Sequence, residues 1–473
     1  MANLVWLRDD LRLADNPALA AASARAEPTC FVYVLDEESP GLRPFGAAQR
    51  WWLHYAVAGL AADLSRKGQR LVLRRGAAAK VIPTLAAAIG ADRVFWNRRY
   101  GHGAIVDEKV RLALRRRPVE TFSANLLFEP SAIQNDEGKP FRAFSAFWRR
   151  AASGPAPRQP RPSPRRLPPP VQDVSGDQIE DWRLIPTAPD WSGRIRGTWQ
   201  PGERGARKRL AAFIAASASR YATERDRPGS FATSMLSPHL RFGEISPHQL
   251  WHAVEGAAAG KIRSELGWRE FAWHTLDAFP DMAKRNINQA FDALPWEEPY
   301  EDDMWAWRRG RTGFPIVDAG MRQLWQTGWM HNRVRMIAAS FLTKDLLVDW
   351  RLGEAWFWDT LVDADPANNP FNWQWVAGTG LHAQPFFRIF NPVLQGERFD
   401  PDGAYVRTYV PELAALPAKY IHKPWAAPEH VLTRAGVRLG ETYPLPLADH
   451  SAARARALNA FLQIRQKRNA QTL

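Results

Sequence analysis

The chain has 473 residues and a formal net charge of +14, with 45% hydrophobic and 24% charged residues. That length is too great for one typical core, so two or three domains are expected, and the composition is that of an ordinary soluble globular protein. No stretch approaches the roughly 18 uninterrupted apolar residues of a membrane span, and residues 1–10 carry charges where a signal peptide would be apolar. We therefore expect a cytoplasmic protein with no membrane partner.

Cysteine usage and charge narrow the chemistry further. Cys30 is the only cysteine, which excludes internal disulfides and cysteine-based zinc or iron–sulfur sites, and no metal is expected. The basic balance, with a pI of about 10.1, favours a polyanionic partner, although heavy arginine use in a GC-rich genome would explain it equally well. The 22 tryptophans fit base stacking, cofactor packing or electron transfer, but packing alone would account for most of them.

Short apolar runs alternate with alanine-rich stretches over the first quarter of the chain. This alternation predicts a parallel, doubly wound sheet covered on both faces, and we assign an α/β domain to residues 1–128. Gly101 and Gly103 hint at a phosphate loop, but Val106 stands where the third glycine of G-x-G-x-x-G belongs, so the signal is weak. The expected strands are 4–7, 30–35, 70–73 and 93–96, with helices at 16–24, 46–67 and 80–89.

The chain then changes character twice. Residues 154–170 are rich in proline and arginine, which predicts an extended, solvated linker, and we place the interdomain linker at 129–202. From about residue 203 the spacing becomes helical, so 203–473 is expected to be an all-α domain, interrupted by turns at 385–402. The expected helices are 204–222, 247–258, 262–278, 319–328 and 332–349.

Short motifs in the helical half carry chemistry. Hydroxyls and backbone N–H groups at 233–237 suit an anion cradle, or simply a helix cap. Glu265, Trp268 and Arg269 share one helical face, which suits a planar heterocycle or a salt-bridged surface. A second face carries an amide, an arginine and a thioether, at Asn332, Arg335 and Met336.

The segment 363–375 reads Asp-Ala-Asp-Pro-Ala-Asn-Asn-Pro-Phe-Asn-Trp-Gln-Trp. Its acids, amides and indoles fit a redox ring that is held, electronically tuned and connected to an electron path. Trp373 and Trp375 are two residues apart in what we expect to be an extended stretch, so their side chains should point opposite ways.

Taken in order, these motifs resemble the DNA photolyase/cryptochrome family, and within it the bacterial cyclobutane pyrimidine dimer photolyases of the class I and class III branch. The resemblance covers nearly the whole chain. It rests on residues 6–16, 221–226, 233–237, 268–271, 313–324, 328–336, 363–365, 373–375 and 387–397.

The resemblance implies FAD, active as FADH⁻ and bound in the helical domain. Arg335 and Asp363 would form a salt bridge beside the isoalloxazine ring. Asn369 would face flavin N5, where a neutral amide suits the fully reduced anionic flavin. The full set of implied cofactor contacts is Tyr221, Thr233, Ser234, Met235, Leu236, Ser237, Arg335, Asp363, Ala364, Asp365 and Asn369.

UV-damaged DNA is the implied partner. Glu265 would bind the carbonyl and N3 edge of the dimer, and Trp268 and Trp375 would form an apolar wall for the flipped bases, with Met336 below. The residues implied to contact the DNA backbone near the lesion are Arg225, Arg269, Asn332, Arg333 and Gln395.

The resemblance also implies an electron path through Trp373, Trp350 and Trp296. The spacing after Trp296 is one residue longer than in the family pattern, so Trp305 or Trp307 are alternatives for the surface member.

Two positions depart from the family pattern. Ile262 stands where a tryptophan often touches FAD, and Gly103-Ala104 stands where class I enzymes carry a folate-binding Asn-Glu pair. The run 43–54 resembles the class III branch, which favours methenyltetrahydrofolate as an antenna bound elsewhere in the α/β domain.

The implied activity is light-driven repair of cyclobutane pyrimidine dimers, with electron transfer from excited FADH⁻ to a flipped lesion, by a monomeric carbon–carbon lyase. The alternatives are a cryptochrome-type blue-light receptor, a (6-4) photolyase using His331 or His382, and a flavin-free basic binding module. The lesion residues, Asn369 and the lack of a long extension before Leu473 disfavour a cryptochrome.

Overall fold

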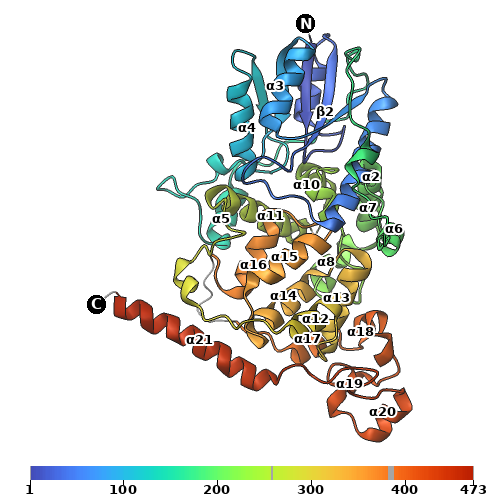
Figure 1. Ribbon diagram of the computed structural model, residues 1–473, viewed down its shortest axis with the longest axis vertical. Coiled ribbons are helices and arrows are strands. Elements are labelled where there is room, and N and C mark those ends of the chain that lie inside the picture. Colours follow the sequence, from blue (N-terminus) through green and yellow to red (C-terminus); the bar gives the residue numbers. More distant parts are fainter. Residues whose placement is uncertain (1, 257–258, 382–387, 472–473) are drawn as a thin grey trace. The chain divides into compact units, whose positions relative to one another are not determined.

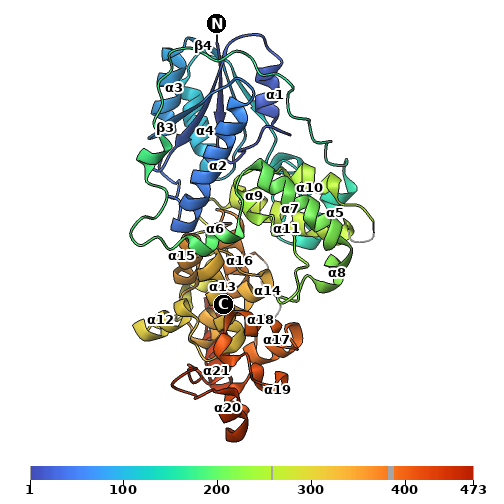
Figure 2. The same cartoon turned by 90° about the vertical axis from the view of Figure 1, so that its right-hand side faces the viewer.

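The computed structural model describes residues 2–256, 259–381 and 388–471 (Figures 1 and 2). The chain forms two compact units that are interleaved along the sequence. Unit 1 comprises Met1–Ser219, Ser234–Pro280 and Val362–Ala367, and unit 2 comprises Arg220–Thr233, Asp281–Leu361 and Asn368–Leu473. The domain boundaries predicted at residues 128 and 202 divide the chain into consecutive segments, whereas these two units are interleaved. Those boundaries therefore stay predictions.

Unit 1 contains a five-stranded sheet in the order β3-β2-β1-β4-β5, and every neighbouring pair is parallel. Helices flank the sheet (Figure 1), which confirms the predicted parallel α/β domain. The last strand and the helix before it were not predicted, because that strand lacks a continuous apolar run. The strands are β1 Ala2–Leu7, β2 Thr29–Leu35, β3 Leu71–Arg75, β4 Ala91–Asn97 and β5 Val119–Phe122, with helices α1 Pro17–Ser23, α2 Ala47–Ser65, α3 Ala78–Ala88 and α4 His102–Ala113.

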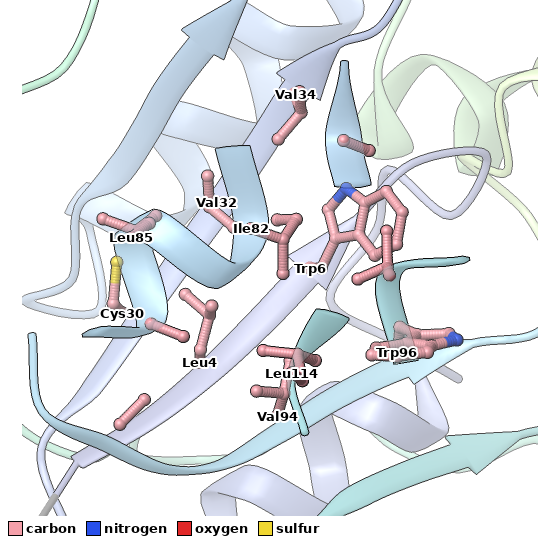
Figure 3. Close-up of a cluster of buried hydrophobic side chains, with 14 of the residues drawn as sticks. Leu4, Trp6, Cys30, Val32, Val34, Ile82, Leu85, Val94, Trp96 and Leu114 are labelled. Carbon is pink, nitrogen blue, oxygen red and sulfur yellow. The ribbon is translucent and has the colours of Figure 1, made fainter. Parts of the chain in front are cut away.

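The core of the sheet is aliphatic with two indoles set among the branched side chains (Figure 3). Every residue of β1 and β2 is buried, as expected for parallel strands covered on both faces. Trp6 and Trp96, on neighbouring strands, meet edge to face with ring centroids 5.6 Å apart. Both are 1% exposed, so these two tryptophans are packing residues.

The glycine pair after β4 begins helix α4 and does not form a phosphate loop. The N–H of Gly101 donates to Asp277 Oδ1 at 3.3 Å, so a carboxylate already accepts from this amide. A Cβ on Gly103 would lie 2.9 Å from Cβ of Arg99, which explains the second glycine by close packing.

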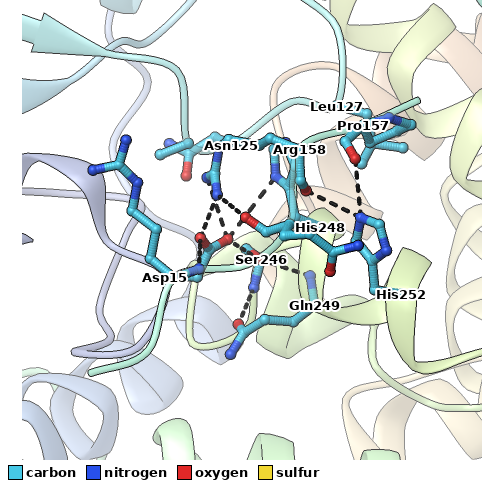
Figure 4. Close-up of polar contacts among 12 residues, drawn as sticks. Asp15, Asn125, Leu127, Pro157, Arg158, Ser246, His248, Gln249 and His252 are labelled. Atoms are coloured by element: carbon cyan, nitrogen blue, oxygen red, sulfur yellow. Dashed lines mark hydrogen bonds and ion pairs between the residues drawn. The ribbon is translucent and has the colours of Figure 1, made fainter. Parts of the chain in front are cut away.

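The proline- and arginine-rich segment 154–170 is extended, as predicted, and many of its residues are exposed, but it is also hydrogen-bonded to the rest of unit 1. Arg158 pairs with the buried Asp15 (Figure 4). The N–H of Asp15 donates to the Arg161 carbonyl, and the N–H of Arg161 donates to Asp15 Oδ1. His252 Nε2 lies 3.0 Å from the carbonyls of Pro157 and Arg158. Prolines lack N–H groups, but their carbonyls still accept hydrogen bonds. Such bonds hold the extended segment against the rest of unit 1.

The remaining elements are helical, in agreement with the predicted all-α half. Within 385–402, where only turns were expected, the structure has helix α17 Pro392–Phe399. Unit 1 also contains α5 Phe144–Ser153, α6 Gly193–Thr198, α7 Glu203–Ala216, α9 Ser237–Arg241, α10 Pro247–Ala253 and α11 Ala259–Ala278. Unit 2 contains α8 Tyr221–Glu224, α12 Glu301–Arg309, α13 Pro315–Thr327, α14 Asn332–Ser340, α15 Trp350–Thr360, α16 Asn368–Ala377, α17, α18 Ala404–Tyr409, α19 Ala418–Ile421, α20 Glu429–Ala435 and α21 His450–Gln471.

Within residues 2–256, 259–381 and 388–471, no helix combines the length and apolar character that crossing a membrane requires. In the same part of the chain, histidine, cysteine, aspartate and glutamate side chains do not gather in threes suited to a metal ion.

Candidate functional site

Helix α16 carries Asn369, Trp373 and Trp375, so the extended stretch predicted for this segment was wrong. Pro370 in the first turn is compatible with a helix start and was the missed signal. Residues two apart on a helix lie about 200° apart around its axis, so the two indoles still point to different sides. Trp373 is 3% exposed, while Trp375 is partly exposed with the Arg388 guanidinium 5.8 Å from its ring centroid.

Trp373 lies in a closely packed aromatic group. Its ring meets Phe357 at 5.0 Å and Trp307 at 6.3 Å between centroids, both edge to face. A Cβ on Gly353 would lie 2.2 Å from Cη2 of Trp373, so α15 needs glycine there to approach the indole. The position of this ring is therefore set by two neighbouring helices, α12 and α15.

Asn369 is held by a carboxylate that sequence reasoning did not single out. Its Nδ2 donates to Glu354 Oε1 at 2.8 Å and to the Glu354 carbonyl at 3.1 Å. Both residues are nearly buried, at 8% and 2% exposure. Because Nδ2 is occupied by Glu354, the amide oxygen is left as the group that Asn369 presents to another partner.

The cradle segment contains a tight backbone curl. Met235 has a φ of 51°, and the N–H of Leu236 donates to Ser234 Oγ at 3.3 Å, just before α9 begins at Ser237. Successive amides in such a curl face one side and suit an anion. Thr233 is the last residue of a segment of unit 2 that begins at residue 220. In that segment the Arg225 guanidinium lies 5.5 Å from the ring of Tyr221.

Unit 1 brings the cradle helix and the acidic segment together. Arg241, the last residue of α9, donates from Nε to the Ala364 carbonyl at 3.0 Å and pairs with Asp9 at 2.7 Å. Asp363 and Asp365 are each 7% exposed, and Asp365 Oδ1 accepts from the N–H of Ala367 at 2.8 Å. Arg241 therefore fixes the backbone between the two predicted flavin carboxylates.

The predicted lesion face of α11 is partly covered by α5. Trp268 stacks on Phe144 with centroids 3.7 Å apart and planes at 10°, so one face of this indole is already occupied. Glu265 pairs with Lys261 at 2.9 Å, and both side chains are partly exposed. Phe144 was not predicted as a site residue, because its partner is more than a hundred residues away in the sequence.

Arg269 and Glu270 form a buried polar group beneath this face. Arg269 donates to the Asn125 carbonyl at 2.9 Å and to Glu270 at 3.2 Å. Glu270 also accepts from the N–H groups of Leu127 and Phe128. Burial raises the pKa of Glu270 to about 7, although Arg269 and these amides act in the opposite direction. The DNA contact expected of Arg269 stays a prediction.

Unit 2 holds the other predicted DNA residues. Arg333 pairs with Asp226 at 2.9 Å and lies 4.4 Å from the Phe399 ring centroid, while Arg335 Nε donates to the Met330 carbonyl at 2.7 Å. The predicted pair between Arg335 and Asp363 joins residues of different units and stays a prediction. Asn332 is exposed, and Met336 and Gln395 are partly exposed.

Known proteins and structures resemble the chain over nearly its full length. A family model described as DNA photolyase matches residues 3–165, and one described as the FAD binding domain of DNA photolyase matches 262–463. A deoxyribodipyrimidine photo-lyase from Agrobacterium fabrum is 50% identical over 98% of both chains. A bacterial class III photolyase structure from Agrobacterium tumefaciens superposes with a TM-score of 0.94 at 49% identity, covering 98% of both chains. Cryptochrome-1 of Arabidopsis thaliana is 37% identical over 98% of this chain and 70% of its own length.

The chain belongs to the DNA photolyase family. Its FAD-binding domain identifies the cofactor as FAD, and the residues present fit that group. The 233–237 curl suits a pyrophosphate, the buried carboxylates Asp363 and Asp365 suit ring N–H and ribose hydroxyl groups, and the Asn369 oxygen is a neutral acceptor. Which photolyase contact each residue makes stays a prediction.

The photolyase electron path predicted through Trp373, Trp350 and Trp296 lies wholly in unit 2. Trp350 is 0% exposed, and Trp296 is partly buried against the Phe291 and Leu294 cluster. Trp307 is also 0% exposed, so it does not offer the surface end that we considered for it, whereas Trp305 is 52% exposed.

Proposed function

We propose that the protein is a light-dependent lyase that repairs cyclobutane pyrimidine dimers in DNA. The observation that carries this proposal is the 50% identity, over 98% of both chains, to an enzyme named deoxyribodipyrimidine photo-lyase. Retention of Glu265, Trp268, Met336 and Trp375, the residues that the resemblance assigns to the lesion, supports the same lesion choice.

The bound reduced flavin supplies, on excitation, the electron that opens the cyclobutane ring and is then recovered. The chain's own residues position the reactants. Flipping the dimer costs a few kcal/mol, and stacking worth roughly 1–3 kcal/mol per base offsets it. Trp268 and Trp375, both partly exposed, provide that stacking in this proposal, and Glu265 accepts hydrogen bonds from the flipped bases. Asn369, fixed by Glu354, presents its amide oxygen to flavin N5.

Damaged DNA is held mainly through its backbone in this proposal. Arg225 and Arg333 lie on unit 2 near exposed Asn332, and the net charge of +14 favours a polyanion. We further propose that the enzyme acts as a monomer in the cytoplasm, and that it is of the class III type.

The second candidate is a blue-light receptor, because Cryptochrome-1 is 37% identical over 98% of this chain. A receptor of this kind would bind FAD but leave dimers intact under light. A (6-4) photolyase is less well supported, because His331, one of its two candidate histidines, is 2% exposed. The other candidate, His382, lies outside the described residues.

We propose methenyltetrahydrofolate as the antenna. The class I folate position at Gly103-Ala104 lies in the first turn of α4, where Gly103 is packed against Arg99. In the 43–54 run, Trp51 and Trp52 are 1% and 0% exposed, which leaves half-buried His54 and Arg50 as the polar candidates to contact it. Extraction of the purified protein should release a pterin with the absorption of this folate.

The decisive experiment illuminates the photoreduced protein with DNA carrying either lesion. Cyclobutane dimers should disappear, and persistence of these dimers while the flavin stays reduced would sink the proposal. Glu265→Ala should lower repair per bound flavin about tenfold, because a hydrogen bond to a charged group contributes roughly 1.5–3 kcal/mol. Lys261→Ala is the matched control, since it removes the partner of Glu265 and should leave repair nearly unchanged.

A further inference from the structure

The indole N–H of Trp350 is the first donor in a chain of two hydrogen bonds. Trp350 is 0% exposed, and its Nε1 donates to Asn286 Oδ1 at 2.9 Å. Asn286, itself 4% exposed, donates from Nδ2 to Asp292 Oδ1 at 2.7 Å. The orientation of the amide follows from its neighbours, because an indole N–H can only donate and an ionised carboxylate can only accept. Asp292 is exposed, so the chain runs from a buried ring to solvent.

Gln374 fixes the segment that supplies this acceptor. The side chain, 0% exposed, donates to the carbonyls of Met282 and Arg285 at 2.6 and 2.9 Å and accepts from the N–H of Ile287 at 2.9 Å. Asn286 therefore lies between two clamped neighbours. Gln374 directly follows Trp373 on α16, so the helix carrying one indole also sets the hydrogen-bond acceptor of the next.

Other tryptophans of unit 2 differ in what their N–H groups meet. Trp307 donates to a backbone carbonyl, that of Ala338, at 3.1 Å. The buried Nε1 of Trp356 has no hydrogen-bond partner among the described residues. The acceptor of Trp350 is instead a side-chain amide backed by a carboxylate. The amide oxygen satisfies the indole and the carboxylate satisfies the amide, so Asp292 acts on Trp350 only through Asn286.

The chemistry of an oxidised indole explains the arrangement. Loss of one electron leaves a positive charge on the ring and makes its N–H acidic. An amide oxygen is a very weak base, so it stabilises the N–H without removing the proton. The negative charge of Asp292, transmitted through the polarised amide, favours the positive ring further.

We propose that Asn286 and Asp292 hold Trp350 as a protonated radical cation during electron transfer, and so act as positioning residues of the electron path. The inference rests on the proposed function, in which Trp350 is a member of that path. Trp350 passes one electron to oxidised Trp373, keeps its proton on Nε1, and is restored by one electron from Trp296. Because no proton leaves, the electron can return to it without waiting for reprotonation.

The test follows the tryptophan radical by transient absorption in the flavin-loaded protein carrying Trp296→Phe, which keeps the radical on Trp350, in H₂O and D₂O. This background should show the protonated radical with a decay insensitive to the solvent isotope. Asn286→Asp places a carboxylate directly against the N–H, and the radical should then deprotonate at least threefold faster, with an isotope effect. Trp350→Phe in the same background should remove the effect, which assigns the signal.

Asp292→Asn provides a second, milder variant, because the residue is exposed and its hydrogen bond can be kept. It should lower the yield of the protonated radical about threefold, whereas the exposed matched control Glu298→Gln should not. If Asn286→Asp folds with full flavin and leaves both the protonation and the decay unchanged, the proposal is wrong. Dimer repair by the wild type is measured in parallel, so a failure of this inference can be told apart from a failure of the proposed function.

Discussion

At the scale of single residues, buried polar groups rather than exposed ones set the properties of the site. Glu354 orients the amide of Asn369, Arg241 fixes the backbone beside Asp363, and Glu270 collects two amides and a guanidinium beneath Trp268. Each of these groups makes hydrogen bonds that its burial requires. Such residues carry no motif that marks them as functional, but they determine where the marked residues lie.

Glu270 should make stability depend on pH. Its folded pKa of about 7 lies above the ordinary value of 4.5, so between these values the folded state keeps a proton that the unfolded state has lost. The free energy of unfolding therefore falls as pH rises from 4.5 to 7, by at most about 3 kcal/mol, and is flat above that range. Glu270→Gln should remove this dependence. In urea unfolding, the free energy of unfolding of the variant relative to the wild type should therefore be higher at pH 7.5 than at pH 5. Parallel changes in the two proteins would contradict the prediction.

At the scale of elements, helix α16 is held between its two indoles and at its C-terminus. Gln374 clamps it to the 282–287 segment, and Lys344 Nζ donates to the carbonyl of Ala377, its last residue, at 2.5 Å. Lys344 comes from a π-helical turn, Phe341–Asp345, that directly follows α14. A donor at a helix C-terminus satisfies a carbonyl that the helix itself leaves unbonded.

Removing this buried cap should loosen α16. Lys344 is 0% exposed, and burial lowers its pKa well below the usual range. Lys344→Met keeps the volume but leaves the Ala377 carbonyl without that donor, so unfolding should become easier by roughly 1–3 kcal/mol. Chemical denaturation and the fraction of bound flavin are the measurements, and both should fall. The exposed Lys284→Met is the control, and equal effects of the two substitutions would argue against a capping role.

At the scale of the whole molecule, the net charge of +14 makes DNA binding sensitive to salt. The structure nevertheless distinguishes the arginines. Arg269 already donates to Asn125 and Glu270 from a side chain that is 12% exposed, whereas Arg225 is partly exposed beside Tyr221. The net charge alone does not distinguish Arg225 from Arg269 as DNA contacts.

Salt dependence should separate them. Each phosphate contact contributes about −0.9 to the slope of log K against log salt on duplex DNA. Arg225→Gln should make the slope shallower by about 1, whereas Arg269→Gln should leave it unchanged because its guanidinium is used internally. Affinities for lesion-bearing duplex at several salt concentrations give both slopes. A shallower slope for Arg269→Gln would instead support the DNA contact that the sequence suggested for Arg269.

The sequence by itself determined the class of this protein. Continuous apolar runs separated by helices are enough to predict a parallel sheet, and motifs spread from Trp6 to Gln395 are specific enough to indicate the family, because both are local properties that survive without coordinates. The tertiary structure decided the rest. The hydrogen bond from Trp350 to Asn286 spans 64 residues, and α16 is helical where the local pattern favoured an extended stretch. Side-chain partners so far apart meet only through packing, which no periodicity along the chain records.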